Sequence, residues 1–179
     1  MEFWIVYDIE TGAELYAGSG STGTAAYQTV PEGAALIVVP QAVVATNPRD
    51  LDALRAALIV GVDATAEDVR QRILTPGAGQ ALAYSMKLAE ARMVLSGGDD
   101  PTPFLTAEAE ARGITVAELA GQVADAAARW AQAGAAIEAA RARAKRALFQ
   151  AATLGGLIQA ARVAWPDVTT SEKDDERHG

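Results

Sequence analysis

The chain of 179 residues contains no cysteine and only one histidine, His178, in a charged C-terminal segment. Without cysteine, neither a disulfide nor a thiolate nucleophile is available, an absence that suits reducing and oxidising compartments equally. A histidine-based dyad, triad or zinc site would have to be assembled around that terminal segment. We therefore expect no catalytic residues, no cofactor and no metal site, and we predict that the protein is not an enzyme.

Basic residues are absent from positions 1–48, whereas five acidic residues occur there: Glu2, Asp8, Glu10, Glu14 and Glu32. The whole chain has a net charge of −8, which disfavours non-specific binding to nucleic acid. The first basic residue follows Asn47-Pro48, so a composition boundary lies there. No segment approaches the ~18 uncharged apolar residues of a membrane span. An acidic N-terminal segment without a basic region also predicts no signal peptide.

Large apolar side chains are scarce. Half of the residues are apolar, but many of these are alanine, and only three Trp, four Tyr and three Phe are present. Alanine has the highest helix propensity but buries little surface, so long helices should form readily over a thin core. Contacts between chains would then supply much of the burial.

Residues 1–46 are expected to form a small antiparallel β module. Aromatic and β-branched residues alternate over Phe3–Asp8, and Glu10-Thr11-Gly12 is a turn signal before a second strand. Thr24–Val30 and Ala34–Val39 are the third and fourth predicted strands. A meander of this size is marginal alone and should pack on a larger body.

Residues 47–169 are expected to form a mainly α-helical body, followed by a mobile polar segment at 170–179. Start and stop signals predict five helices. The first runs from Asn47-Pro48 to Gly61, and the second begins at the Thr65 cap. The third runs from Thr75-Pro76 to Gly97-Gly98, the fourth lies around Ala107–Ala111 and ends at Gly113, and the fifth begins at Thr115. In the third of these, two apolar lines, one with Leu82 and Met86 and the other with Tyr84 and Leu88, indicate a sandwiched helix.

A heptad pattern dominates the last of these helices, predicted over about residues 115–154. Thr115 and Glu118 form a capping box at its start, and Gly155-Gly156 indicates a kink or an end. We predict that five residues of this seam form a helix–helix or oligomer interface: Val116, Leu119, Val123, Trp130 and Ile137. The seam is covered either by the helix from Thr75 in the same chain or by other copies, and we favour a homo-oligomer. Alanine at so many seam positions does not choose between two, three or more strands.

Three loops and one charged cluster are candidates for binding. Gly18–Gly23 lacks the lysine and spacing of a phosphate-binding loop, so we interpret it as a turn. Thr75–Gln80 is interpreted as a helix cap with a closely packed first turn rather than as an anion site, and Asp99-Asp100 as solvated charges. Arg141, Arg143, Lys145 and Arg146 form the basic cluster, for which pairing with acidic residues of a neighbour is favoured over nucleic-acid contact.

Two segments carry a family resemblance. Phe3–Asp8 with Thr11-Gly12, followed by Val30–Gly33, resembles the N-terminal β module of tail-fibre and fibre-assembly proteins of tailed bacteriophages. The segment Ile73–Gln80 with Tyr84, Lys87 and Glu90-Ala91 resembles a helical segment of accessory proteins of phages and gene-transfer agents. In such proteins, the following motifs occur in the same order as here: Pro103, Glu108-Ala109, Gly113, Trp130, Ile137-Glu138 and Arg141.

The resemblance implies a virion structural protein that attaches or supports a fibre, a spike, or a neighbouring tail or head protein. It brings no catalytic residues. It also favours a trimer for the homo-oligomer, because fibre-associated proteins resemble one another in that symmetry. The expected partners are other virion proteins, with no nucleic acid and no membrane, and the expected location is the particle surface, after assembly in the host cytoplasm. The alternative is a tail-fibre assembly chaperone that is absent from the mature particle. A hydrolase of cell-surface glycan is the competing enzymatic class, and it would need two carboxyl groups ~5–10 Å apart in a cleft.

Overall fold

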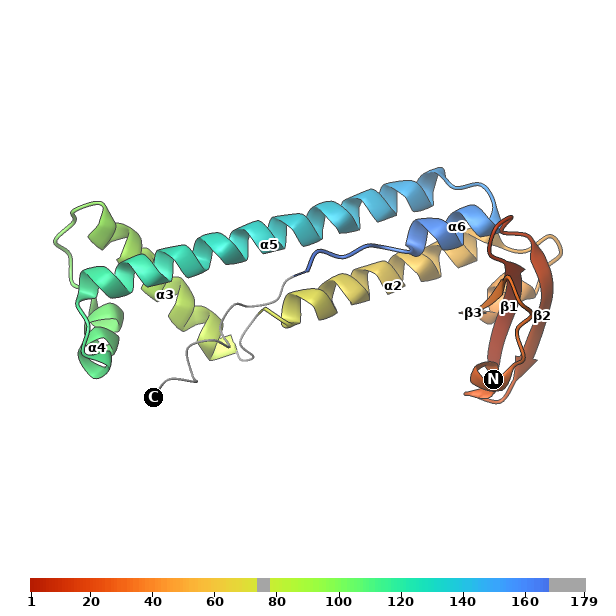
Figure 1. Cartoon of the computed structure of the whole chain (residues 1–179), viewed down its shortest axis with the longest axis horizontal. Helices are drawn as coiled ribbons and strands as arrows, with labels where there is room; N and C mark the ends of the chain where they lie inside the picture. The colour runs from red at the N-terminus through yellow and green to blue at the C-terminus, as the bar shows by residue number, and fades with distance from the viewer. Residues whose placement is uncertain (74–77, 168–179) are drawn as a thin grey trace. The chain divides into compact units, whose positions relative to one another are not determined.

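A computed structural model describes residues 1–73 and 78–167. The fold is α+β, as predicted: a small antiparallel sheet precedes a mainly helical body with one long helix (Figure 1). Two compact units are present, one of Met1–Glu67 with Glu138–Trp165 and the other built mainly from Asp68–Ile137. The predicted helix start at Thr75-Pro76 and the polar segment 170–179 with His178 lie outside the described residues.

The sheet has three strands in the order β2 (Glu14–Gly20), β1 (Glu2–Asp8), β3 (Ala34–Val39), all antiparallel to their neighbours. Ile5 of β1 lies opposite Ala17 of β2 and Ile37 of β3. Alternation along β1 sends Trp4 and Val6 to one face and Ile5 to the other, and all three side chains are buried. The central strand is therefore covered on both faces.

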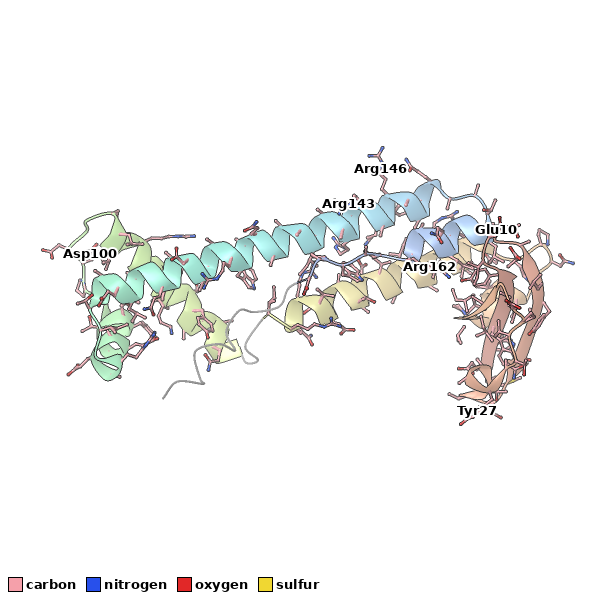
Figure 2. All side chains as sticks on the ribbon, in the orientation of Figure 1. Glu10, Tyr27, Asp100, Arg143, Arg146 and Arg162 are labelled. Atoms are coloured by element: carbon pink, nitrogen blue, oxygen red, sulfur yellow. The ribbon has the colours of Figure 1, made fainter. Side chains whose placement is uncertain are left out.

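The predicted third strand at Thr24–Val30 is wrong, because these residues contain a short 3₁₀ helix, η1 (Thr24–Tyr27). The carboxylate of Glu2 accepts a hydrogen bond from the backbone N–H of Ala25 at 2.8 Å. Ala25 packs on Trp4 and Val6 and so covers one face of the sheet. Tyr27 extends outward from this turn (Figure 2). A long-range carboxylate contact thus occupies an N–H group that a fourth strand would need.

The other face of the sheet joins the main core of the first unit. Ile5 and Val39 pack there with Val43 of α1 (Gln41–Val44) and with buried residues of three longer helices: Leu54, Val62, Ala144, Leu148 and Leu157. These helices are α2 (Leu51–Gln71), the C-terminal part of α5 (Val116–Gln150) and α6 (Leu154–Ala161). Residues from both ends of the sequence thereby form one core.

α2 is a single helix, so the predicted start at Asn47-Pro48, the stop at Gly61 and the cap at Thr65 are wrong. Asp50 caps the helix instead, because its Oδ1 accepts the N–H groups of Asp52 and Ala53 at 3.1 and 2.9 Å. The Thr65 hydroxyl donates to the carbonyl of Gly61 at 2.9 Å inside the helix. A helical glycine costs about 1 kcal/mol relative to alanine, which the burial of Leu54 and Val62 outweighs.

α5 starts with the predicted capping box. The Thr115 N–H donates to Glu118 at 2.9 Å, and the Glu118 N–H donates to the Thr115 hydroxyl at 3.2 Å. The helix ends at Gln150, earlier than the predicted residue 154. Arg55 of α2 explains this end, because its guanidinium donates to the carbonyl oxygens of Leu148 and Ala151, each at 3.0 Å. Gly155 and Gly156 lie in the first turn of α6, where the Thr153 hydroxyl accepts the Gly156 N–H at 3.1 Å.

The second unit contains α3 (Ala78–Leu95), α4 (Pro103–Arg112) and the N-terminal part of α5. The predicted helix around Ala107–Ala111 is confirmed, and it ends at Gly113 with a positive φ of 67°. The backbone N–H of Ile114 returns to the carbonyl of Ala109 at 3.1 Å. This glycine C-cap turns the chain directly into the capping box of α5.

Candidate interaction surfaces

The five heptad residues proposed from the sequence lie in three different environments. Leu119 and Ile137 are buried, Val116 and Val123 are partly buried, and Trp130 is 49% exposed. Leu119, Val116 and Val123 share one cluster with residues of α3 and α4: Ala91, Leu105 and Ala109. That cluster includes neither Trp130 nor Ile137. The three seam residues thus make helix–helix contacts within one chain.

Trp130 lies on the same side of α5 as the buried seam. At 3.6 residues per turn, Leu119, Trp130 and Ile137 lie within about 20° of one another around the helix axis. Between Leu119 and Ile137, none of the described residues is buried apart from Ala120. Trp130 is therefore a large aromatic side chain in a stretch of α5 without buried residues, and it remains open to a partner.

Both apolar lines of α3 contain exposed residues, since Tyr84 and Leu95 are 49% and 55% exposed. Ala91, from the line that contains Tyr84 and Leu88, is buried against α4 and α5. On the other line, Leu82 is 66% exposed, Met86 is 44% exposed, and Ala89 is exposed. Within this chain the apolar packing of α3 is therefore restricted to the region of Ala91 and Val94, whereas the sequence predicts a sandwiched helix.

Polar contacts fix α3 and α4 to each other beside this surface. The buried carboxylate of Glu90 in α3 accepts the N–H groups of Phe104 and Leu105, at 3.2 and 2.8 Å, in the first turn of α4. Lys87 of α3 donates to Glu108 of α4 at 2.7 Å, and this bond is the main cause of the lowered pKa of Glu108. Sequence reasoning missed the role of Glu90, although an acidic residue on an apolar helix face is a signal for it.

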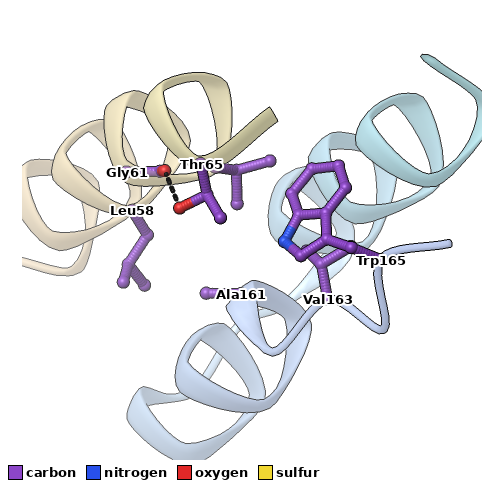
Figure 3. Close-up of a pocket in the computed structure, with 7 residues that line it drawn as sticks. Leu58, Gly61, Thr65, Ala161, Val163 and Trp165 are labelled. Carbon is purple, nitrogen blue, oxygen red and sulfur yellow. Dashed lines mark hydrogen bonds between the residues drawn. The ribbon is translucent and has the colours of Figure 1, made fainter. Parts of the chain in front are cut away.

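A small hollow lies within the first unit, between α2 and the segment that follows α6 (Figure 3). Its volume is about 170 Å³, and it is lined by Leu58, Gly61, Val62, Thr65, Ala161, Val163 and Trp165. The Thr65 hydroxyl already donates to the carbonyl of Gly61. Since no charged side chain lines the hollow, it is suited to an apolar group rather than to acid–base chemistry.

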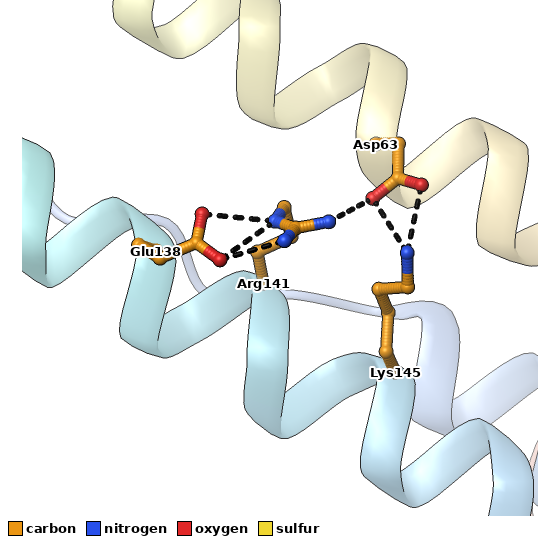
Figure 4. A network of polar contacts seen from close by, with 4 residues as sticks. All are labelled: Asp63, Glu138, Arg141 and Lys145. Carbon is orange, nitrogen blue, oxygen red and sulfur yellow. Dashed lines mark hydrogen bonds and ion pairs between the residues drawn. The ribbon is translucent and has the colours of Figure 1, made fainter.

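A charged network joins α2 to α5 in the first unit (Figure 4). Asp63 accepts hydrogen bonds from Arg141 at 2.7 Å and from Lys145 at 2.9 Å, and Arg141 also donates to Glu138 at 2.6 Å. The pKa of Asp63 is lowered, chiefly by the bond from Lys145 and then by that from Arg141. The pKa of Arg141 is raised, chiefly by Glu138 and then by Asp63. These groups stay ionised and hold two helices together.

The basic cluster proposed from the sequence is therefore divided. Arg141 and Lys145 pair with Asp63, 78 and 82 residues away in the chain. Arg143 and Arg146 are exposed and contact no acidic group among the described residues. Arg146 extends away from α2 (Figure 2).

The carboxyl groups whose pKa is shifted share one direction of shift in the described part of the chain. Each carboxyl group with a resolved pKa shift there has a lowered pKa, caused by cations or hydrogen-bond donors: Asp8, Glu14, Asp63, Glu108 and Glu118. Within residues 1–73 and 78–167, no three His, Cys, Asp or Glu side chains are grouped to hold a metal ion.

The Gly18–Gly23 segment has a packing role, because a methyl group on Gly18 would lie 2.6 Å from the Trp4 ring.

Comparison with known proteins gives no match: no family model, curated protein or solved structure is similar to this chain. None of the described helices is long and apolar enough to cross a membrane.

Proposed function

We propose that the protein is a non-enzymatic structural component of a phage or phage-like particle, where it attaches or supports a fibre, spike or neighbouring tail or head protein. The observation that carries the proposal is the exposed apolar side of α3, with Leu82 and Met86, in a unit whose helices pack together around Ala91, Leu105 and Leu119. An apolar helix side of this kind is suited to helix–helix packing with a partner protein. The resemblance of residues 3–146 to virion accessory proteins supplies the class of partner.

The partners we propose are other virion proteins together with further copies of this chain, in a homo-oligomer that we expect to be a trimer. Trp130 supports this part of the proposal, since a half-exposed tryptophan in line with the buried residues Leu119 and Ile137 is suited to anchor an interface. The proposed location is the surface of the phage tail or head, after assembly in the host cytoplasm.

Mass spectrometry of purified particles tests the structural role. We expect this chain in a fixed ratio to the major tail or head proteins, and we expect it to survive a salt wash that removes loosely bound protein. Absence from particles, together with copurification with an unassembled fibre protein, would instead support the alternative role of assembly chaperone. Presence in neither would contradict both roles.

A helix-face variant makes the test specific. Leu82→Ser with Met86→Ser changes two exposed side chains and should leave the fold intact, as measured by circular dichroism. We expect particles carrying this variant to lose the protein or the fibre that it supports. Val60→Ser is a suitable control, because Val60 is an exposed apolar residue of α2 in the first unit.

A further inference from the structure

Nearly every charged side chain of the first unit has a partner. Glu14 binds Arg49, Asp52 binds Arg55, and Asp63 binds Arg141 and Lys145. Among the described residues of this unit, four charged side chains have neither a hydrogen bond nor an ion pair, and all four are exposed: Glu10, Glu32, Arg143 and Arg146. The unpaired charges are thus two acids and two bases.

The two acids lie at the same end of the sheet. Glu10 belongs to the turn between β1 and β2, and Glu32 to the turn before β3. The two turns are adjacent, because the backbone N–H of Ile9 donates to the carbonyl of Gly33 at 2.9 Å. Ile9 itself is 50% exposed. We call Ile9, Glu10 and Glu32 the acidic corner.

The two bases lie on successive turns near the end of α5. Arg143, Arg146 and Phe149 are spaced three residues apart, so their side chains form one oblique row along the helix surface. Phe149 is 68% exposed. Asp63 binds Arg141 and Lys145 on the side of α5 that faces α2, whereas Arg146 points away from α2 (Figure 2). We call Arg143, Arg146 and Phe149 the basic row.

We propose that the acidic corner of one copy binds the basic row of a second copy of this chain. The two surfaces are complementary in the sign and number of their charges, and each has one exposed apolar residue beside its charges. Because the chain has a net charge of −8, the rest of the surface of one copy repels that of another. The unpaired basic row attracts acidic groups instead and so directs the approach of the two copies. The contact uses a surface other than that of Trp130 in the proposed homo-oligomer, and it does not depend on the proposed role in a particle.

This contact should be weak and sensitive to salt. Exposed ion pairs contribute little, and screening shortens their range from about 10 Å at 0.1 M salt to about 3 Å at 1 M. We therefore expect self-association that is detectable at high protein concentration in low salt and that decreases strongly above about 0.5 M NaCl.

Sedimentation velocity on the full chain tests the contact with charge-reversed variants. Arg143→Glu with Arg146→Glu should raise the dissociation constant about tenfold or more, as should Glu10→Lys with Glu32→Lys. The variant with all four changes exchanges the two charged surfaces and should restore the wild-type value to within about threefold. Each of the two double variants weakens association by itself. Recovery of association in the fourfold variant therefore indicates direct pairing between the two exchanged surfaces.

The matched control is Arg92→Glu with Arg129→Glu. Both arginines are exposed in the second unit without a partner among the described residues, and the change in net charge is the same. The proposal is overturned if the control weakens association as much as Arg143→Glu with Arg146→Glu, if the fourfold variant remains dissociated, or if the wild type stays monomeric at millimolar concentration in low salt. Circular dichroism confirms that each variant is folded, and the result is independent of whether the protein is found in particles.

Discussion

Gly12 and Gly155 meet backbone to backbone: a methyl group on Gly155 would lie 2.4 Å from the Cα of Gly12. Gly12 forms the turn after β1 with a positive φ of 71°, and Gly155 lies in the first turn of α6. The close approach brings the hairpin turn and α6, which are more than 140 residues apart in sequence, into direct contact. It explains why Gly155, which the sequence marks as a helix break, occurs inside a helix.

Gly155→Ala should therefore destabilise the protein, because neither backbone can retreat easily. Overpacking of this kind costs about 1–3 kcal/mol in free energy of unfolding. Gly61→Ala is the matched control in α2, since a methyl group there would meet nothing within 4 Å, and it should stabilise by about 0.5–1 kcal/mol. Urea unfolding measures both variants, and a neutral Gly155→Ala variant would disprove the close contact.

Glu90→Ala should leave the N–H groups of Phe104 and Leu105 without an acceptor in the first turn of α4, where Leu105 is buried. The loss of such partners costs about 1–3 kcal/mol per unsatisfied buried group. Glu90→Gln keeps one acceptor oxygen and should cost less. Chemical denaturation measures the series, with Glu110→Ala on the exposed side of α4 as the control. Equal losses for the Ala and Gln variants would argue against this capping role.

Acid should destabilise the protein through Asp63, whose pKa is lowered from its ordinary value of 3.8 by Lys145 and Arg141. Because the folded-state pKa lies below the unfolded-state pKa, this stabilisation is complete at neutral pH and is lost as the pH falls below about 4 and through the folded-state value. Asp63→Asn should cost about 1 kcal/mol or less at pH 7, since the site is partly exposed.

Urea unfolding between about pH 7 and about pH 2.5 tests this dependence. We expect the difference between Asp63→Asn and the wild type to shrink towards zero in acid. The control Asp125→Asn changes an exposed carboxylate without a partner among the described residues and should follow the wild type throughout. A difference that remains constant with pH would exclude the ion pairs as its cause.

Trp130 and Ile137 should respond differently to truncation, although both belong to the predicted seam. Ile137 is buried, so Ile137→Ala should cost about 2–5 kcal/mol at any protein concentration. Trp130→Ala should cost less in the monomer but should remove the rise in Tm with protein concentration that an oligomer produces. Calorimetry over a wide range of concentrations measures both effects. A wild-type Tm that is independent of concentration would contradict a Trp130 interface.

Local signals in the sequence predicted the elements that depend on neighbouring residues. Thr115 and Glu118 form the predicted capping box because both partners lie within one helical turn. Gly113 ends α4 as predicted because the positive φ is a property of that residue alone. The α+β class and the long helix followed from patterns of the same local kind.

Tertiary structure decided the features that depend on partners far away in the chain. The end of α5 depends on Arg55, the loss of the expected strand at Thr24–Val30 depends on Glu2, and the division of the basic cluster depends on Asp63. The same holds for the seam, where Leu119 is buried and Trp130 is not. A favourable helix propensity or a helix cap contributes about 1 kcal/mol to stability, so burial and ion pairing between distant residues outweigh it. No local sequence pattern identifies which distant residues will come into contact.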